Sequence, residues 1–532
     1  MALGCTLVLA LALSISALLP CRGFLLPAQL GGLRTHPRVT GTLCATGFLP
    51  PCRGRKRGSD GRALHVRACS EEVEGSRVAM ANEFLRERGI FGSDNVEIGP
   101  CGALGMGLVA KRPISGNQEV VVEVPPSMMI TEDTAMEGTG EAGMLLKAML
   151  QDLMGFQPQS AVELGDALIA LRLMYERAAG DASALFPYVR MLPESLDMPL
   201  FWPQAERERL LKGCLILEDT QALEETITGQ YDFINDMVLG MFPEKFPEEF
   251  FSLEQYRFHV CLSISRAFSL DGMKGLGRGL ALLPGIDMAN HDDGVKFAVQ
   301  RGDGVFSGRD SIVLISDRDY AEGEQVFTTY GRKSNAQSLY AFGFTREDPM
   351  HPFNSADIAL QLDASDPLRQ MKAQVLTANG IYSRMRFQVP VSQELIAEGL
   401  SRKAPASTQS EKMEGGPLGM TEQLVDSWAQ VLPFLRMLSL GGDGASELLS
   451  GDPQEAWLRM WTPLEGSLED DAVDALIKHF DGMLQVLEED VAPAARAGLT
   501  ERERVSAVVR ASEAAALREG RAALSALKTG TS

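Results

Sequence analysis

The stretch from Leu283 to Phe344 decides the fold of this chain. It opens with LPGIDMANH at residues 283–291, and it closes with GEQVFTTYGRKSN at residues 323–335 and YAFGF at residues 340–344. The first segment places Asp, Asn and His directly after an apolar run, and the second leads a β-branched and aromatic strand into Tyr330 and a glycine turn. Because polar side chains at strand ends are held by a rigid scaffold, this stretch predicts a functional site.

The composition is that of a globular protein. The chain has 532 residues, of which 45% are hydrophobic and 23% are charged. A chain of this length exceeds one ordinary hydrophobic core, so we expect two or three domains.

The first 75 residues differ from the rest. The apolar run Leu7–Leu19 is too short to span a bilayer and predicts a signal peptide over residues 1–23. Residues 24–75 are rich in arginine, poor in acids and without an apolar period, as in a transit peptide. With Phe24 at the junction, the two segments resemble the presequence of algae with complex plastids. We therefore expect plastid import and a mature protein without a membrane segment, with plain secretion as the alternative.

Charge and cysteine content narrow the possible partners. Residues 1–75 hold 9 of the 50 basic and 4 of the 71 acidic residues, which leaves 41 against 67 and a net charge of −26. Such a surface repels phosphates, so we expect no nucleic-acid partner, whereas a basic peptide segment suits it. The cysteines beyond residue 75 are Cys101, Cys214 and Cys261. Their wide spacing predicts buried thiols and neither a zinc site nor a disulfide framework.

Strand-like and helical patterns alternate along the chain. A glycine-rich turn at residues 102–110 precedes Pro113 and a strand instead of an amphipathic helix, which excludes a dinucleotide-binding fingerprint. Strand character continues through residues 119–131, and the segment after Pro352 is expected to be helical. The expected helices are residues 76–92, 163–179, 206–229, 254–268, 467–490 and 500–528, the last with a Thr500–Glu503 capping box. The pattern predicts an α+β unit followed by an all-α region.

Four motifs in a fixed order carry a resemblance. They are LGMGLVA at residues 104–110, SRAF at residues 265–268, DMANH at residues 287–291 and the segment 323–335 that contains Tyr330-Gly331. Together they resemble the SET domain of protein methyltransferases of the Rubisco large-subunit lysine methyltransferase type. The resemblance implies a SET β-fold over residues 76–350 with a helical insertion at about 133–258. It further implies an all-α substrate-binding domain over residues 351–532, in which the Ser-, Lys-, Gly- and Glu-rich residues 401–421 are a disordered insertion.

The resemblance also implies a chemistry. Such enzymes use S-adenosylmethionine (SAM) without a metal to methylate a protein substrate, by analogy the Rubisco large subunit or a plastid aldolase, and we expect a monomer. Tyr330 is then the catalytic phenol, and Asp287 braces a turn. The residues expected to bind the cofactor are Leu104 and Met106 through their backbone, Arg266, Asn290, His291 and Phe344. Phe297 and Phe342 are expected in the substrate pocket.

Three functions remain open at this stage. Lysine methyltransferases of the family often carry Tyr at the position of Phe342 and again near that of Phe297. The missing hydroxyls leave open a protein-histidine methyltransferase or a higher degree of lysine methylation. A docking module without turnover is the third possibility. Taken alone, Tyr330 at a strand end is typical of packing and Arg266 of an ordinary ion pair, so the expectation depends on the whole set.

Overall fold

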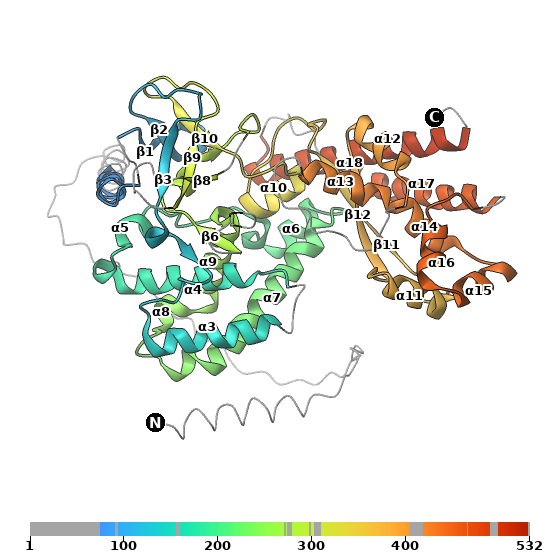
Figure 1. Cartoon of the computed structure of the whole chain (residues 1–532), viewed down its shortest axis with the longest axis horizontal. Coiled ribbons are helices and arrows are strands. Elements are labelled where there is room, and N and C mark those ends of the chain that lie inside the picture. The colour runs from blue at the N-terminus through green and yellow to red at the C-terminus, as the bar shows by residue number, and fades with distance from the viewer. Residues whose placement is uncertain are drawn as a thin grey trace. The chain divides into compact units, whose positions relative to one another are not determined.

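The computed structural model describes residues 75–90, 94–155, 160–270, 273, 279–296, 299–302, 310–404, 419–464, 467–489 and 498–529 (Figure 1). The expected signal and transit peptides lie outside these residues, except for residue 75. Phe297 and most of the insertion expected at 401–421 also lie outside them. The chain divides into the units Met1–His65 and Val66–Ser532, and all described residues belong to the second.

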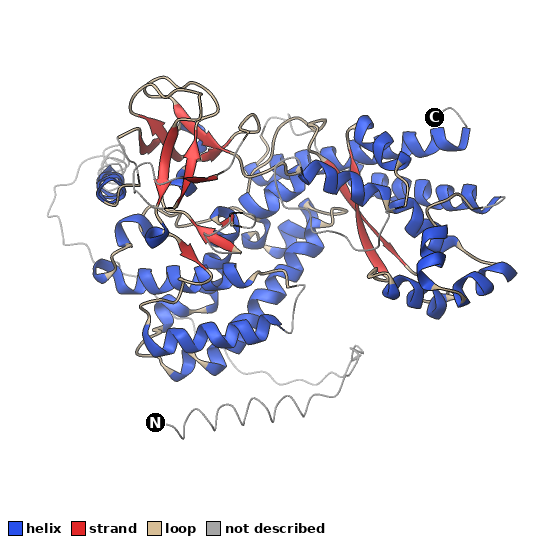
Figure 2. Ribbon diagram, viewed as in Figure 1, coloured by secondary structure: helices blue, strands red, loops and turns tan. Residues whose placement is uncertain are grey.

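Short strands build the part of the chain that precedes Tyr330 (Figure 2). In the described residues they are β1 (Val96–Pro100), β2 (Met106–Ala110), β3 (Val120–Val124), β4 (Ile130–Thr131), β5 (Phe268–Ser269), β6 (Leu280–Leu282), β7 (Asn290–His291), β8 (Gln300–Gly302), β9 (Ser311–Ile315) and β10 (Gln325–Thr328). They form three sheets with the orders β1-β2-β10-β7, β3-β9-β8 and β4-β6-β5. In β3, β6 and β9 the β-branched and leucine side chains, such as Val122, Leu282 and Ile312, are almost fully buried, and this packing favours strand pairing there.

The register of β10 places the candidate site. β10 pairs antiparallel with β2 through Val326 and Leu108, and parallel with β7 through Phe327 and Asn290. Thr328 is opposite His291, two residues before Tyr330. Because the two strands run in the same direction, their carboxyl ends meet at one edge of the sheet.

Helices interrupt the strands between β4 and β5. They are α3 (Gly140–Gly155), α4 (Leu164–Ala179), α5 (Phe186–Val189), α6 (Gln204–Leu210), α7 (Ile216–Met237), α8 (Glu248–Phe251) and α9 (Leu253–Arg266). α9 begins at an N-cap where the Ser252 side chain accepts a hydrogen bond from the Gln255 amide. It packs along α4, and at this contact the Ser263 hydroxyl donates to the buried Asp166 carboxyl over 2.7 Å. The last residue of α9 is Arg266, so this helix places the Arg266 guanidinium next to the strands that follow it.

The region after Tyr330 is mainly helical, and it contains a strand pair that the sequence patterns did not predict. Its elements are α10 (Asn335–Phe342), β11 (Ser355–Gln361), α11 (Arg369–Ala378), β12 (Arg384–Pro390), α12 (Gln393–Ser401), α13 (Gly419–Ala429), α14 (Val431–Ser439), α15 (Asp443–Ser450), α16 (Pro453–Arg459), α17 (Ser467–Glu488) and α18 (Glu501–Thr529). β11 and β12 pair antiparallel over their whole lengths. Their buried positions, such as Ile358, Phe387 and Val389, alternate with partly exposed ones, and α18 covers them. The fold is therefore α+β as expected, but the C-terminal region is not all-α, because it contains this antiparallel strand pair.

Other elements differ from the expectation at their ends. The helix expected at 206–229 is two helices, α6 and α7, because Gly213 lies between them with a φ of +88° that ordinary side chains avoid. The strand expected at 119–131 is divided by Pro125 and Pro126, since proline cannot donate to a β ladder. The first expected helix spans residues 75–87. The Thr500–Glu503 capping box is present, with both reciprocal hydrogen bonds formed.

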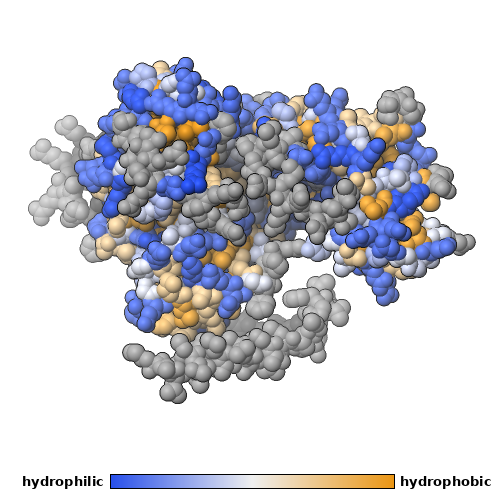
Figure 3. Space-filling view, in the orientation of Figure 1, coloured by the Kyte–Doolittle hydropathy of each residue, from blue (hydrophilic) through white to orange (hydrophobic). Residues whose placement is uncertain are grey.

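The described surface is mixed in character. On the face in Figure 3 apolar residues lie in separate patches among hydrophilic ones. None of the described helices combines the length and the hydropathy that a bilayer crossing requires. Cys214 and Cys261 are buried free thiols as expected, whereas Cys101 is half-buried.

Candidate active site

Tyr330 is held at two points. Its backbone amide donates to Nδ1 of His291 over 3.0 Å, and the two rings stack with centroids 5.2 Å apart. Its hydroxyl donates to the carbonyl oxygen of Ala289 over 3.0 Å. Burial raises the pKa of the Tyr330 phenol, so the group remains protonated at neutral pH. A neutral phenol whose proton is engaged with a carbonyl presents its oxygen lone pairs to the surrounding space.

Two phenylalanines complete an aromatic wall around Tyr330. The ring centroid of Phe342 lies 4.8 Å from that of Tyr330, and that of Phe344 lies 6.4 Å away. Phe342 ends α10, and Gly343 follows with a left-handed φ of +78°, which turns the chain so that both rings lie on the same side. A Cβ at residue 343 would also meet the carbonyl oxygen of Asp197 at 3.1 Å. The wall is suited to a cationic or sulfonium group, because aromatic faces attract positive charge.

The buried residue Asp287 fixes the orientation of the Arg266 side chain. One guanidinium nitrogen (Nη1) donates to the backbone carbonyl of Asp287 over 2.7 Å and lies 3.4 Å from its carboxylate oxygen Oδ2. The hydroxyl of Tyr188 donates to the same carboxylate over 2.8 Å, and the amide of Gly285 donates to its other oxygen. Burial raises the pKa of the fully enclosed Asp287, although the Arg266 charge and these hydrogen bonds oppose the shift. Asp287 therefore braces the turn, as expected, and also fixes the direction of Arg266.

The glycine-rich turn closes onto Asn290. The side-chain amide of Asn290 donates to the carbonyl of Met106 over 3.2 Å. Gly107 allows this approach, since a Cβ there would lie 2.7 Å from Nδ2 of Asn290 and from Sγ of Cys101. Leu104 is the last residue of a 3-10 turn, and its side chain is 57% exposed.

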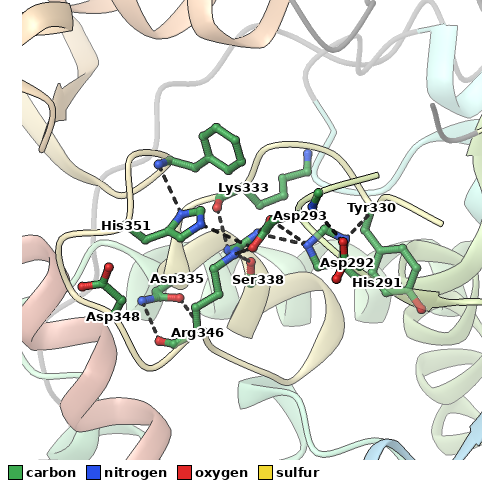
Figure 4. A network of polar contacts seen from close by, with 12 residues as sticks. His291, Asp292, Asp293, Tyr330, Lys333, Asn335, Ser338, Arg346, Asp348 and His351 are labelled. Carbon is green, nitrogen blue, oxygen red and sulfur yellow. Dashed lines mark hydrogen bonds and ion pairs between the residues drawn. The ribbon is translucent and has the colours of Figure 1, made fainter. Parts of the chain in front are cut away.

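A polar network next to His291 was not predicted from the sequence (Figure 4). Nε2 of His291 lies 2.9 Å from Oδ1 of Asp293, and Nη2 of Arg346 donates to the same oxygen over 2.6 Å. Arg346 Nε donates to the other oxygen, and Nε2 of His351 lies 3.4 Å from that oxygen. Burial opposes ionisation of Asp293, but the hydrogen bonds from His291 and Arg346 outweigh it and hold the pKa of this carboxyl well below its usual range. In the sequence, the feature that could have indicated this network is the Asp-Asp pair directly after Asn290-His291.

The expected site residues are partly assembled by these contacts. Tyr330, His291, Phe342 and Phe344 form one set of ring contacts, and Asn290 bonds to Met106. Arg266 contacts Asp287 and, at 3.9 Å, the sulfur of Met288. Phe297 lies outside the described residues. Among the described residues no group of His, Cys, Asp and Glu side chains is arranged to hold a metal ion.

Comparisons with known proteins agree with this organisation. Residues 105–331 match the SET domain family, and residues 363–517 match the Rubisco LSMT substrate-binding family. In solved structures, the SET domain of LSMT bound to lysine and AdoHcy has a TM-score of 0.67 at 20% identity, covering 86% of this chain and 92% of that one. A structure of Rubisco LSMT bound to AdoMet has a TM-score of 0.65, also at 20% identity, over 86% and 93%. These likenesses show the fold.

Curated relatives fall into two groups. The chloroplastic [fructose-bisphosphate aldolase]-lysine N-methyltransferase of Arabidopsis thaliana is 26% identical over 76% of this chain and 74% of its own length. The actin-histidine N-methyltransferase of Danio rerio is 29% identical over 63% of this chain and 56% of its own length, and that of Mus musculus is 28% identical over 55% and 47%. The chain thus spans about half the length of the actin-histidine enzymes.

The chain thus has a SET domain followed by a Rubisco LSMT substrate-binding domain, and it is similar to LSMT in this organisation.

Proposed function

We propose that this chain is a SAM-dependent protein-lysine N-methyltransferase. The observation that carries the proposal is Tyr330, tethered through its amide and its hydroxyl inside a wall of Phe342 and Phe344, next to Arg266 and Asn290-His291. The residues fit the cofactor: Arg266 supplies a charge for a carboxylate, the turn before Met106 supplies backbone groups, and the aromatic wall suits a sulfonium. SAM would supply an electrophilic methyl group at this place.

The side chains then have separate tasks. The oxygen of Tyr330 offers lone pairs for C–H···O contacts with an electron-poor methyl group, because its proton is engaged with Ala289. The aromatic wall excludes water, which favours the neutral, nucleophilic form of an incoming lysine amine. The phenol itself is a poor base at neutral pH, since burial raises its pKa. The wall aligns and desolvates the acceptor, and alignment is the main requirement of an in-line transfer.

A protein-histidine methyltransferase is the second candidate. Phe342 places a ring without a hydroxyl against Tyr330. A hydroxyl there would serve to orient a lysine amine, and an imidazole acceptor has no such amine to orient. The similarity to actin-histidine N-methyltransferases supports this alternative. The proposed protein substrate is a plastid protein, supported by the chloroplastic relative and by the composition of residues 1–75. Rubisco large subunit and plastid aldolase are the first substrates to examine.

One experiment separates these functions. Plastid proteins are incubated with the purified chain and isotopically labelled SAM, and the modified residue is located by fragmentation mass spectrometry. Label on lysine supports the proposal, and label on histidine replaces it with the alternative. Calorimetry with SAM in the presence of a chelator should show binding at one site. Binding to a plastid protein without any label transfer would identify a docking module instead.

The proposed import is tested by sequencing the N-terminus of the protein isolated from cells. The mature chain should begin roughly between residues 65 and 85, since boundaries from sequence patterns carry errors of a few residues. An intact Met1 or a start at Phe24 contradicts plastid import.

A further inference from the structure

We propose that Asp293 is a positioning residue for Tyr330, acting through His291 and held in place by Arg346. This inference builds on the proposed function of Tyr330. Three successive contacts connect these residues. Arg346 binds Asp293, Asp293 faces His291, and His291 accepts a hydrogen bond from the Tyr330 amide.

The contact at Tyr330 selects one tautomer of His291. A backbone amide can only donate, so Nδ1 of His291 must accept and carry no proton. In the neutral ring the proton then lies on Nε2, which is 2.9 Å from Oδ1 of Asp293. In the opposite tautomer the proton on Nδ1 would point at the N–H of Tyr330. The lone pair on Nε2 would then face the carboxylate of Asp293. Asp293 therefore stabilises the one neutral form that can bind the Tyr330 backbone.

Arg346 holds the carboxylate of Asp293 against the ring of His291. It binds both oxygens of Asp293, and its Nη2 lies 3.2 Å from Nε2 of His291. Both nitrogens face Oδ1 of Asp293, and with the proton on Nε2 both of them donate to that oxygen. His351, the other ionisable ring at Asp293, has its pKa lowered mainly by burial. The ion pair thus fixes the carboxylate oxygen that faces Nε2 of His291, and with it the orientation of the ring.

The same arginine anchors the network to the helices. Nη1 of Arg346 donates to the carbonyl of Lys333 over 2.9 Å, three residues after Tyr330. The backbone amide of Arg346 donates to the side chain of Asn335, which in turn donates to the hydroxyl of Ser512 on α18. Tyr330 is therefore bracketed by contacts from this network at its own amide and at the turn that follows it. Loosening the network should displace the phenol relative to the aromatic wall.

The test is Asp293→Asn in the full chain. The amide keeps the size of the carboxylate, but it can donate to Nε2 and so favour the tautomer that cannot accept the Tyr330 amide. We expect kcat to fall about 10-fold to 100-fold, as a misplacement of about 1 Å does, with a smaller change in KM and in SAM affinity. The matched control is Asp292→Asn. Asp292 is the adjacent acid, and its carboxylate accepts a hydrogen bond from Arg318 over 3.0 Å, so the control should retain parental kcat.

A second readout does not depend on activity. With 15N-labelled histidine, the ring nitrogens of His291, assigned with a His291→Asn variant, should report an Nε2–H tautomer in the parent and in Asp292→Asn. In Asp293→Asn they should shift toward Nδ1–H or toward a mixture. Thermal melting of all variants checks that they are folded.

The outcomes separate the two proposals. An unchanged tautomer or an unchanged kcat in Asp293→Asn, or an equal loss in Asp292→Asn, overturns the positioning role. If the parent transfers no methyl group, the proposed function fails, whereas the nitrogen signals still decide whether Asp293 sets the tautomer. Partial recovery of kcat in Asp293→Glu is expected, because the carboxylate can again accept from Nε2.

Discussion

The ring of Phe342 lies against the ring of Tyr330, with centroids 4.8 Å apart and planes inclined by 45°. The first residue ends a helix and the second follows a strand, and twelve positions of sequence separate them. Under the proposed function, this ring without a hydroxyl would line the path along which an acceptor approaches the phenol. Adding one oxygen atom to this ring therefore tests both the identity of the acceptor and the degree of methylation.

Adding a hydroxyl at this ring should restrict the product. In Phe342→Tyr the new oxygen can hydrogen-bond an amine or a water and restrain a partly methylated lysine. We expect the distribution of products to shift toward fewer methyl groups per lysine, as measured by intact-mass analysis of the substrate. Phe201→Tyr, in the helical insertion, is the control and should not alter the distribution. An unchanged product distribution in Phe342→Tyr would show that this ring does not line the acceptor path.

Removing the hydroxyl of Tyr330 should affect rate more than binding. Tyr330→Phe keeps the ring contacts but loses a fixed dipole, so we expect turnover to fall by about 10²–10³-fold with nearly unchanged SAM affinity. Tyr231→Phe is a matched control, because its hydroxyl also donates to a backbone carbonyl, that of Phe251, over 2.9 Å. Single-turnover rates and calorimetry measure the two effects. Equal activity of Tyr330→Phe and the parent would mean that Tyr330 only packs.

Arg266 should contribute to both binding and stability. Arg266→Ala removes an anchor for a carboxylate, and a loss of one charge-assisted hydrogen bond weakens SAM binding by roughly 10-fold to 100-fold. It also leaves Asp287 enclosed without its partner, which costs about 3 kcal/mol of unfolding free energy. The double variant Arg266→Ala/Asp287→Asn should regain part of this stability and none of the affinity. Denaturant unfolding and calorimetry on the same samples separate the two roles, and recovered SAM affinity in the double variant contradicts the anchoring role.

Stability should depend on pH through Glu513. This side chain on α18 is 2% exposed, and burial raises its pKa to about 8, assisted by the charge of Asp357. In the unfolded chain the carboxyl ionises near its ordinary value of about 4.3, so between that pH and about 8 the folded state holds one more proton. The unfolding free energy should therefore decrease as the pH rises through this window.

Glu513→Gln tests this dependence. The variant removes the titration, so it should be more stable than the parent at pH 8, by a few kcal/mol at most, and the difference should shrink toward pH 5. Urea unfolding of both proteins between pH 5 and pH 8.5 measures it. Parallel pH profiles would show that Glu513 does not titrate in this range.

Some features of the fold were predictable because they depend on neighbours in the sequence. The capping box at Thr500 and Glu503, the long helix α18 and the glycine-rich turn before Met106 each follow from residues within a few positions of one another. The antiparallel pair of β11 and β12 was not predicted. Its two strands are separated by α11, and each becomes a strand by pairing with the other and packing under α18.

For the candidate site the division is similar. The order of the motifs around Asn290-His291 and Tyr330 was sufficient to predict the SET fold and to select the residues to examine. The tertiary structure decided which of these residues touch: Arg266 is turned by Asp287, and His291 by Asp293 and Arg346, which lies 53 residues further on. Hydrogen bonds and ion pairs act over a few ångströms in space, whatever the distance along the chain. The sequence by itself thus determined the kinds of groups available for chemistry, and only the packed chain determined their directions and their partners.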